Sequence, residues 1–237
     1  MTADNRGVST MQRWVRSICA AVLVSVLVAC GSGDDARPVM TVDAEGVSTI
    51  DGRVLTDQLA TVPASALSQA EAASLLFMRE EEQLAHDVYA VSATLWPPPI
   101  FANIAASEAT HSSAVKTLLD RYALTDPLAG LPNGTFKTPA FQALYNALVS
   151  ASRVSLIEAL KVGVQIEELD IRDITAQQTA IDNADILNVY DNLLRGSRNH
   201  LRAFMKVLTQ QGGTYVPQYI SQAEFDAIVN APMETGR

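Results

Sequence analysis

The sequence predicts an all-α fold, a four-helix bundle with one long crossover between its second and third helices and a short C-terminal helix. Three observations support this fold class. Helix start and stop signals bound four long segments. Each segment repeats apolar residues at alternating steps of three and four, the spacing of a helix seam. Only the connection between the second and third segments is long.

The start and stop signals set the helix boundaries. Ser68 and Glu71 form a capping box that begins the first long helix, and three consecutive prolines end it after Leu95. Pro139 stands where proline is favoured, in the first turn of a short helix. Gly212 and the glycine after it end the fourth long helix. The helices after the first are expected at about residues 100–123, 139–150, 155–174, 183–211 and 221–229.

The connection lengths predict the topology. The first and second long helices are joined tightly, as are the third and fourth, so each pair is antiparallel. The second and third are separated by about thirty residues that hold only the short helix. This single crossover is the ferritin-like variant of the bundle.

Residues 1–29 are predicted to be a lipoprotein signal peptide. Arg13 and Arg16 precede an apolar run, Ile18 to Ala29, that is too short to span a bilayer comfortably. Small residues then precede Cys30, a pattern that resembles a bacterial lipobox. The alternative is an ordinary signal peptide with an incidental cysteine.

A lipidated Cys30 would attach the chain to a membrane at the extracytoplasmic face of the cell envelope. The residue after Cys30 is Gly31 and not an aspartate. In a cell with two membranes, this favours attachment to the outer membrane. Residues 30–66 are expected to form a flexible tether, with a short hairpin within residues 41–55 as the alternative. Residues 67–230 then form the helical domain, and residues 231–237 a tail.

Composition restricts the function. A hydrophobic content of 48% with 18% charged residues allows a buried core. The net charge of −9 argues against nucleic-acid binding, which needs a basic surface. The sequence has no zinc-finger spacing, Walker loop or dinucleotide-binding glycine motif.

Polar residues lie at the middle of every predicted helix seam, between apolar ends. They are Glu82, Glu108, His111, Glu167, Asp170 and His200. A buried, unpaired carboxylate costs several kcal/mol, so a shared layer of them calls for a positive charge between the helices. Four carboxylates and two imidazoles suit two iron ions, with manganese as the alternative.

Each of these residues also has a purely structural interpretation. Glu108 and His111 could be a satisfied buried pair, and Glu82 could lie on a solvated face. Asp170 could cap a helix or pair with an arginine. The seam favours Glu167 over Glu168, which would then face solvent.

Three further residues are expected around the metal rather than on it. Tyr89 would hydrogen-bond a ligand carboxylate, unless it is simply a core residue. His86 lies one turn after Glu82 but off the seam, so we expect it in the surroundings of the centre or on the surface, with a metal ligand as the alternative. Ser197 precedes His200 by three residues and joins this outer set.

Four segments carry a resemblance to a known superfamily. Residues 79–89 and 103–111 resemble the first two helices of ferritin-like proteins, and residues 163–171 resemble the third-helix Glu-x-x-Glu of rubrerythrins. Residues 196–204, followed by 215–221, are similar to an uncharacterised bacterial and archaeal family, domain of unknown function 2202. The likeness covers about residues 67–230.

The resemblance implies a dimetal-carboxylate oxidoreductase that reacts with O2 or peroxide or oxidises Fe(II). Electrons would come from a separate donor, because the chain has no rubredoxin-type cysteine pairs. Ser197 departs from the pattern, since ferritin-like proteins carry a glutamate at that position. The alternative is a membrane-anchored metal-binding or scaffold lipoprotein without catalysis. A homodimer is compatible with the seams, which can pair between chains.

Overall fold

The computed structural model describes residues 37–235, which are mostly helical, and the all-α class is confirmed at that level. These residues form seven helices and one small sheet: β1 Met40–Val42, β2 Ser48–Ile50, α1 Gly52–Thr61, α2 Gln69–Leu95, α3 Ile100–Arg121, α4 Pro139–Ser152, α5 Leu156–Gln178, α6 Ala184–Gln210 and α7 Gln222–Asn230. The predicted signal peptide and Cys30 lie outside the described residues.

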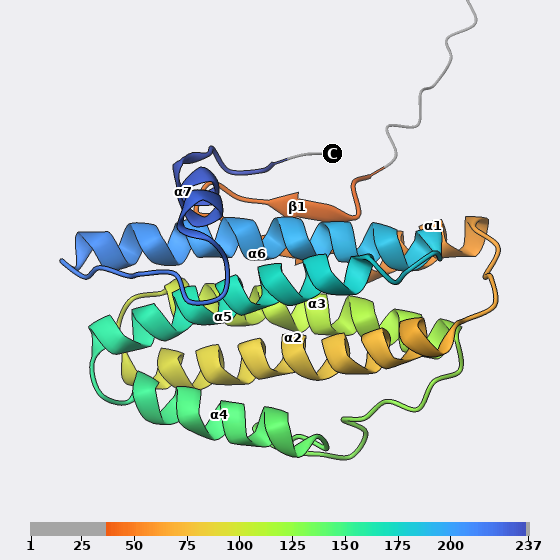
Figure 1. Ribbon diagram of the computed structural model, residues 1–237, viewed down its shortest axis with the longest axis horizontal. Helices are drawn as coiled ribbons and strands as arrows, with labels where there is room; N and C mark the ends of the chain where they lie inside the picture. The colour runs from red at the N-terminus through yellow and green to blue at the C-terminus, as the bar shows by residue number, and fades with distance from the viewer. Residues whose placement is uncertain (1–36, 236–237) are drawn as a thin grey trace, which may run out of the picture. The chain divides into compact units, whose positions relative to one another are not determined.

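Four long helices surround the core (Figure 1). Helix α2 packs along α3 and α5 packs along α6, while α3 also contacts α6 and α2 contacts α5. Helix α4, from the long connection, lies against α2 and α5. The capping box at Ser68 is present, and Glu71 also accepts the backbone N–H of Asn183 at 2.9 Å. The first turn of α2 is thereby joined to the start of α6.

The apolar core is divided into two clusters by a polar layer. One cluster gathers around Tyr89, Phe101 and Phe204, and the other around Met78 and Tyr190. Each cluster draws side chains from the long helices on its side of the layer. The apolar ends and polar middle predicted for each helix seam therefore form three successive layers along the helices.

The structure differs from the predicted tether over residues 30–66, because residues from Val39 onward pack on the helices. Strands β1 and β2 pair antiparallel, and Gly46 takes a positive φ of 89° in the connecting turn. Strand β2 contacts α3 and α6, and α1 contacts α3. Met40 and Leu55 are each only 1% exposed. A few apolar side chains on one face of this otherwise polar segment therefore hold it against the helices.

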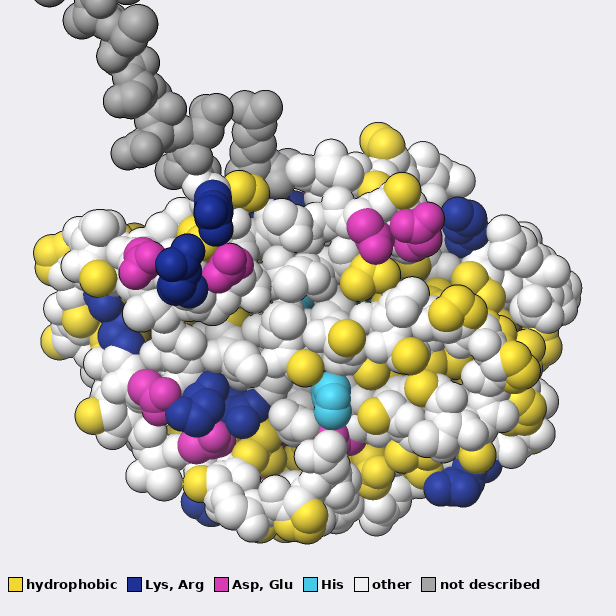
Figure 2. All heavy atoms as spheres, turned by 180° about the vertical axis from the view of Figure 1, so that it is seen from behind, with side chains coloured by type: hydrophobic (Ala, Val, Ile, Leu, Met, Phe, Trp, Pro, Cys, Tyr) yellow, Lys and Arg dark blue, Asp and Glu magenta, His cyan; other side chains and the backbone are white. Residues whose placement is uncertain are grey.

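The outer surface is mixed in charge. Figure 2 shows acidic and basic side chains interspersed over one face, with hydrophobic side chains between them. Helix α5 continues about one turn beyond the predicted end, to Gln178, through Thr175, Ala176 and Gln177, which do not continue the apolar period of the helix. No helix within residues 37–235 combines the length and hydropathy that crossing a membrane requires.

Candidate metal centre

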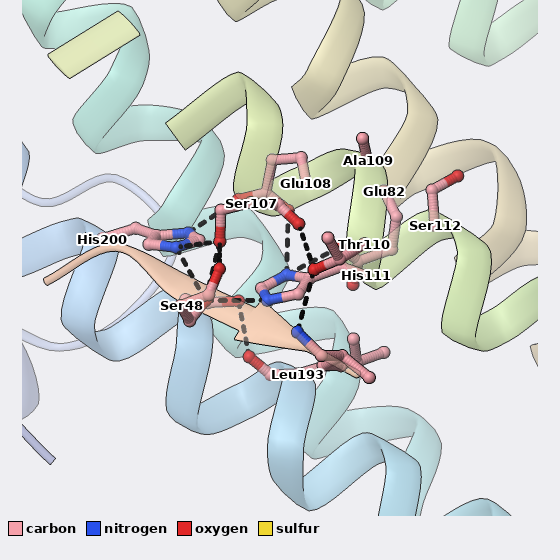
Figure 3. Close-up of polar contacts among 12 residues, drawn as sticks. Ser48, Glu82, Ser107, Glu108, Ala109, Thr110, His111, Ser112, Leu193 and His200 are labelled. Carbon is pink, nitrogen blue, oxygen red and sulfur yellow. Dashed lines mark hydrogen bonds and ion pairs between the residues drawn. The ribbon is translucent and has the colours of Figure 1, made fainter. Parts of the chain in front are cut away.

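The polar layer brings together five side chains from four helices. They are Glu82 of α2, Glu108 and His111 of α3, Glu167 of α5 and His200 of α6, and none is more than 1% exposed. The two imidazole rings stack with centroids 5.3 Å apart and planes inclined by 16°. Figure 3 shows the rings side by side, with Glu108 reaching between them.

Glu108 is shared by the two histidines. Its Oε1 lies 2.6 Å from Nδ1 of His200, and its Oε2 lies 3.0 Å from Nδ1 of His111. A second carboxylate approaches each ring: Glu82 Oε2 is 3.5 Å from His111 Nδ1, and Glu167 Oε2 is 3.4 Å from His200 Nδ1. One atom each from Glu108, His111 and His200 lie within 4.8 Å of one another, close enough to hold one metal ion.

Two serine hydroxyls hold the opposite edge of both rings. Ser48 Oγ lies 2.8 Å from His111 Nε2 and 2.9 Å from His200 Nε2, while Ser107 Oγ lies 2.9 Å from His200 Nε2. The Ser107 hydroxyl donates to the Ser48 carbonyl, and the two hydroxyl oxygens are 2.8 Å apart. The proton of Ser107 is used on the Ser48 carbonyl, so in the contact between the two hydroxyl groups Ser48 is the donor. The Ser48 oxygen has no second proton and can only accept from the two histidines, so both Nε2 atoms donate to it. Both Nδ1 atoms are then left for the carboxylates or a metal.

The charges in the layer are strongly coupled. Burial opposes protonation of the histidines, but the Glu108 carboxylate outweighs it and raises the pKa of His111 to about 10 and of His200 to about 9. Burial also opposes ionisation of Glu108, yet the positive charges of the two histidines hold the pKa of Glu108 well below its usual value. Burial raises the pKa of Glu82 to about 7. Without metal, protons on Nδ1 take the place that a cation would occupy.

Two more carboxyl groups extend the layer. Asp170 is 1% exposed and neither of its oxygens has a hydrogen-bond partner; the same is true of Glu81, which the sequence did not single out. Burial and then the charge of Glu81 raise the pKa of Asp170, and burial and then the charge of Asp173 raise that of Glu81. With Asp170, four buried carboxyl groups of the layer share two imidazoles, a donor set that fits a cation, and Glu81 lies next to them.

The three residues expected around the centre lie in different places. Tyr89 is at the cluster, where its hydroxyl donates to Glu167 Oε1 at 2.7 Å. The buried Ser197 hydroxyl donates to the Leu193 carbonyl at 3.1 Å, within its own helix. His86 is not brought to the cluster: its side chain is 21% exposed and its Nδ1 lies 2.7 Å from the carboxylate of Asp87.

The expectation that Glu168 faces solvent is wrong. Glu168 is fully buried, because the segment after α6 folds over α5 and covers it. Its Oε1 accepts the backbone N–H groups of three consecutive residues, and its Oε2 accepts the Tyr215 hydroxyl at 2.7 Å. The N–H donors are Gln218, Tyr219 and Ile220.

Four residues of the site were not found from the sequence. Ser107 is four residues before His111, so helical spacing alone could have placed it on the same face. Gly196 lets α6 approach, since a Cβ there would lie 2.5 Å from His111 Cε1. Glu81 is hidden in a run of three acids, and Ser48 stands in the segment expected to be a tether, without any local signal.

Fold and site together define a helical protein with a buried cluster of glutamates and histidines that can hold a metal ion. The chain belongs to the family described as "Uncharacterized protein domain (DUF2202)", whose sequence model matches residues 71–232. The sequence resemblance to that family is thereby confirmed.

One archaeal relative is similar over most of its length. The uncharacterized protein MJ0754 of Methanocaldococcus jannaschii is 44% identical over 180 residues, which cover 76% of this chain and 97% of that protein. The crystal structure of hypothetical protein MJ0754 from Methanococcus jannaschii DSM 2661 matches with a TM-score of 0.72 at 46% identity. That match covers 73% of this chain and 99% of the crystallised one.

Proposed function

We propose that the helical domain is a ferritin-like four-helix bundle with a dimetal-carboxylate centre, and that two iron ions are its cofactor. The observation that carries the proposal is the paired geometry around Glu108. Each of its oxygens faces the Nδ1 of a different histidine, and each histidine has a further carboxylate beside it. Manganese is the alternative metal for this set of oxygen and nitrogen donors.

The residues divide into two half-sites that share Glu108. Glu82 and His111 would hold one ion, and Glu167 and His200 the other. Ser197 supplies no carboxylate to the layer, because a serine stands where ferritin-like proteins have a glutamate. Asp170 adds a carboxylate to the same layer. The carboxyl oxygens of Glu82 and Asp170 and one oxygen of Glu167, which have no hydrogen-bond partner among the described residues, support this assignment, because leaving them without a cation would be costly.

The proposed activity is oxidation of Fe(II), or reduction of O2 or peroxide. A bound iron pair would supply the redox chemistry, with carboxylate ligands favouring the higher oxidation state. The protein's own part is to hold both imidazoles through Ser48, to orient Glu167 through Tyr89, and to exclude water from the layer. Electrons would come from a separate donor.

Metal loading tests the proposal. Purified protein incubated anaerobically with Fe(II) is expected to retain close to two ions per chain and to consume peroxide in an Fe(II)-dependent manner. Replacing Glu108 and His111 together, E108Q with H111Q, should abolish retention, while the metal-free variant should still unfold in one cooperative transition that shows it to be folded. The matched control pair, E158Q with H86Q, removes the same residue types outside the cluster and should retain the metal.

Two outcomes would contradict the proposal. Retention of fewer than about 0.2 ions per wild-type chain would exclude a metal centre of useful affinity. Equal metal content in wild type and in the E108Q/H111Q variant would favour the alternative, in which the lipoprotein is a scaffold.

The location of the protein is a second part of the proposal. The pattern around Cys30 supports lipidation of that cysteine and attachment to the extracytoplasmic face of the envelope, with the outer membrane favoured. Metabolic labelling with a fatty-acid analogue tests it. Wild type should be labelled and the C30A variant should not.

A further inference from the structure

A second concave site lies between α2, α4 and α5, beside the polar layer. It is a cavity of about 500 Å³, within the size range of sites for small organic ligands. Its lining comes from all three helices and from Tyr219 in the segment after α6. Its lining includes none of the five side chains gathered in the layer, which are Glu82, Glu108, His111, Glu167 and His200.

The wall of this cavity is mostly apolar. Phe77 and Leu76 of α2, Phe141 of α4 and Leu169 of α5 line it. Leu169 is only 8% exposed and lies deep, whereas Ala73 and Ala140 are exposed and mark the mouth. Such a wall removes the apolar body of a ligand from water, which is the main source of its affinity.

A carboxyl group without a partner stands at the deep end. Glu81 lines the cavity, is 1% exposed, and has no hydrogen-bond partner at either oxygen among residues 37–235. Its neighbours in the lining are already engaged. Glu80 accepts the backbone N–H and the hydroxyl of Thr138, and Asp173 is paired with Arg172 at 2.7 Å. Glu81 is therefore the group left to bind a hydrogen-bond donor.

The cavity and the candidate metal centre occupy adjacent faces of the same helices. Glu81 precedes Glu82 in α2, and Leu169 precedes Asp170 in α5. Successive residues of an α-helix are rotated by about 100°, so one member of each pair faces the cavity and the other faces the layer. A ligand bound at Glu81 would lie one side chain away from the centre.

We propose that this cavity binds a small organic molecule with an apolar body and a hydrogen-bond-donating end, a hydroxyl or an amine, placed at Glu81. Binding itself depends only on the cavity and is measured without metal.

Isothermal titration of the metal-free, full-length protein tests binding. The probes are 4-phenylbutanol and 4-phenylbutylamine, which combine an apolar body with each donor type. We expect saturable one-to-one binding with a Kd below about 1 mM, given the small number of heavy atoms. The A140W variant, which places an indole at the mouth, should weaken binding at least about tenfold. The control A143W, on an exposed face of the same helix outside the lining, should leave it unchanged.

A probe with a negatively charged end tests whether the end of the cavity at Glu81 prefers a hydrogen-bond donor. The probe 4-phenylbutyrate should bind at least about fivefold more weakly than the alcohol, because its carboxylate would be buried next to the carboxylate of Asp173. The E81Q variant should reduce this discrimination. If A140W fails to fold, A73W blocks the same mouth from α2.

Three results would overturn the proposal: no saturable binding by wild type, equal binding by the blocked variant, or preference for the carboxylate probe. Its failure is distinct from that of the metal proposal. Probe binding without iron retention supports the cavity alone, and iron retention without probe binding supports the centre alone.

Discussion

Two groups of buried carboxylates in this protein differ in how their oxygens are satisfied. Glu168 and Glu108 are both essentially inaccessible to solvent. Glu168 is surrounded by hydrogen-bond donors of the protein itself, three backbone N–H groups and a tyrosine hydroxyl. Within the described residues, Glu108 faces two imidazole nitrogens and no other donor, in a layer where the oxygens of Glu82 and Asp170 have no hydrogen-bond partner.

The difference separates a structural carboxylate from a site. A buried anion whose oxygens are all bonded stabilises the segment that supplies the donors. A buried cluster with too few donors costs stability unless a cation enters it. Burial alone would have grouped Glu168 with the candidate ligands; only the partners distinguish them.

The largest effect should come from removing the structural carboxylate. The E168A variant leaves three backbone N–H groups and a hydroxyl without their acceptor, so it should destabilise the protein by about 3 kcal/mol or more. The melting temperature should fall by roughly 6 to 12 °C. Iron retention per folded chain should not change. Calorimetry and metal analysis check the two parts, and Y215F, which removes one donor only, should have a smaller effect.

A methyl group at Gly196 should damage the cluster instead. A Cβ would lie 2.5 Å from His111 Cε1 and 3.0 Å from Ser48 Oγ, so the ring or α6 must move. We expect G196A to destabilise the metal-free protein by about 2 kcal/mol and to weaken metal binding about tenfold or more. A competition titration with a chromophoric chelator measures the affinity. An affinity equal to that of wild type would show that His111 is not a ligand.

The metal-free protein should lose stability as pH rises from about 6.5 to 10. The pKa of His111 is raised to about 10 and that of His200 to about 9, so between these pH limits the folded state binds more protons than the unfolded state. This contribution is complete below pH 6.5 and is lost as the pH passes the folded-state values. Thermal melts should show a fall of about 5 °C or more across this range.

The control for the pH dependence is a variant without the two imidazoles, H111Q with H200Q. Its melting temperature should fall less over the same range. Because metal must displace protons from Nδ1, metal affinity of the wild type should rise with pH over this range, the opposite trend. A parallel decline of both proteins would show that the histidines are not the groups responsible.

The smallest effect should come from the hairpin serine. The S48A variant removes the hydroxyl that accepts from both Nε2 atoms, while Ser107 remains next to His200. We expect a loss of about 1 to 2 kcal/mol in stability and up to about tenfold in metal affinity. The S113A control removes a hydroxyl exposed on the same helix as His111 and should change neither.

Much of the fold and of the cluster could be predicted from the sequence because its signals are local. The capping box at Ser68 and the seam positions of Glu82, Glu108 and His111 depend only on helical spacing. His86 could be distinguished from His111 in the same way, by its position off the seam. The packing of the hairpin on the helices could not be predicted, although a hairpin was one alternative for that segment. Its buried side chains are few, and they contribute to stability only through their contacts with α3 and α6.

The sequence by itself determined the all-α class, the long helices and the polar middle of each one, because helix periodicity and capping act within a few residues of chain. Tertiary structure alone decided that Ser48 holds both imidazoles, that Glu168 is enclosed by the C-terminal segment, and that Glu81 ends a cavity. These roles depend on which donors other segments bring to a buried oxygen or nitrogen, and that choice leaves no local pattern.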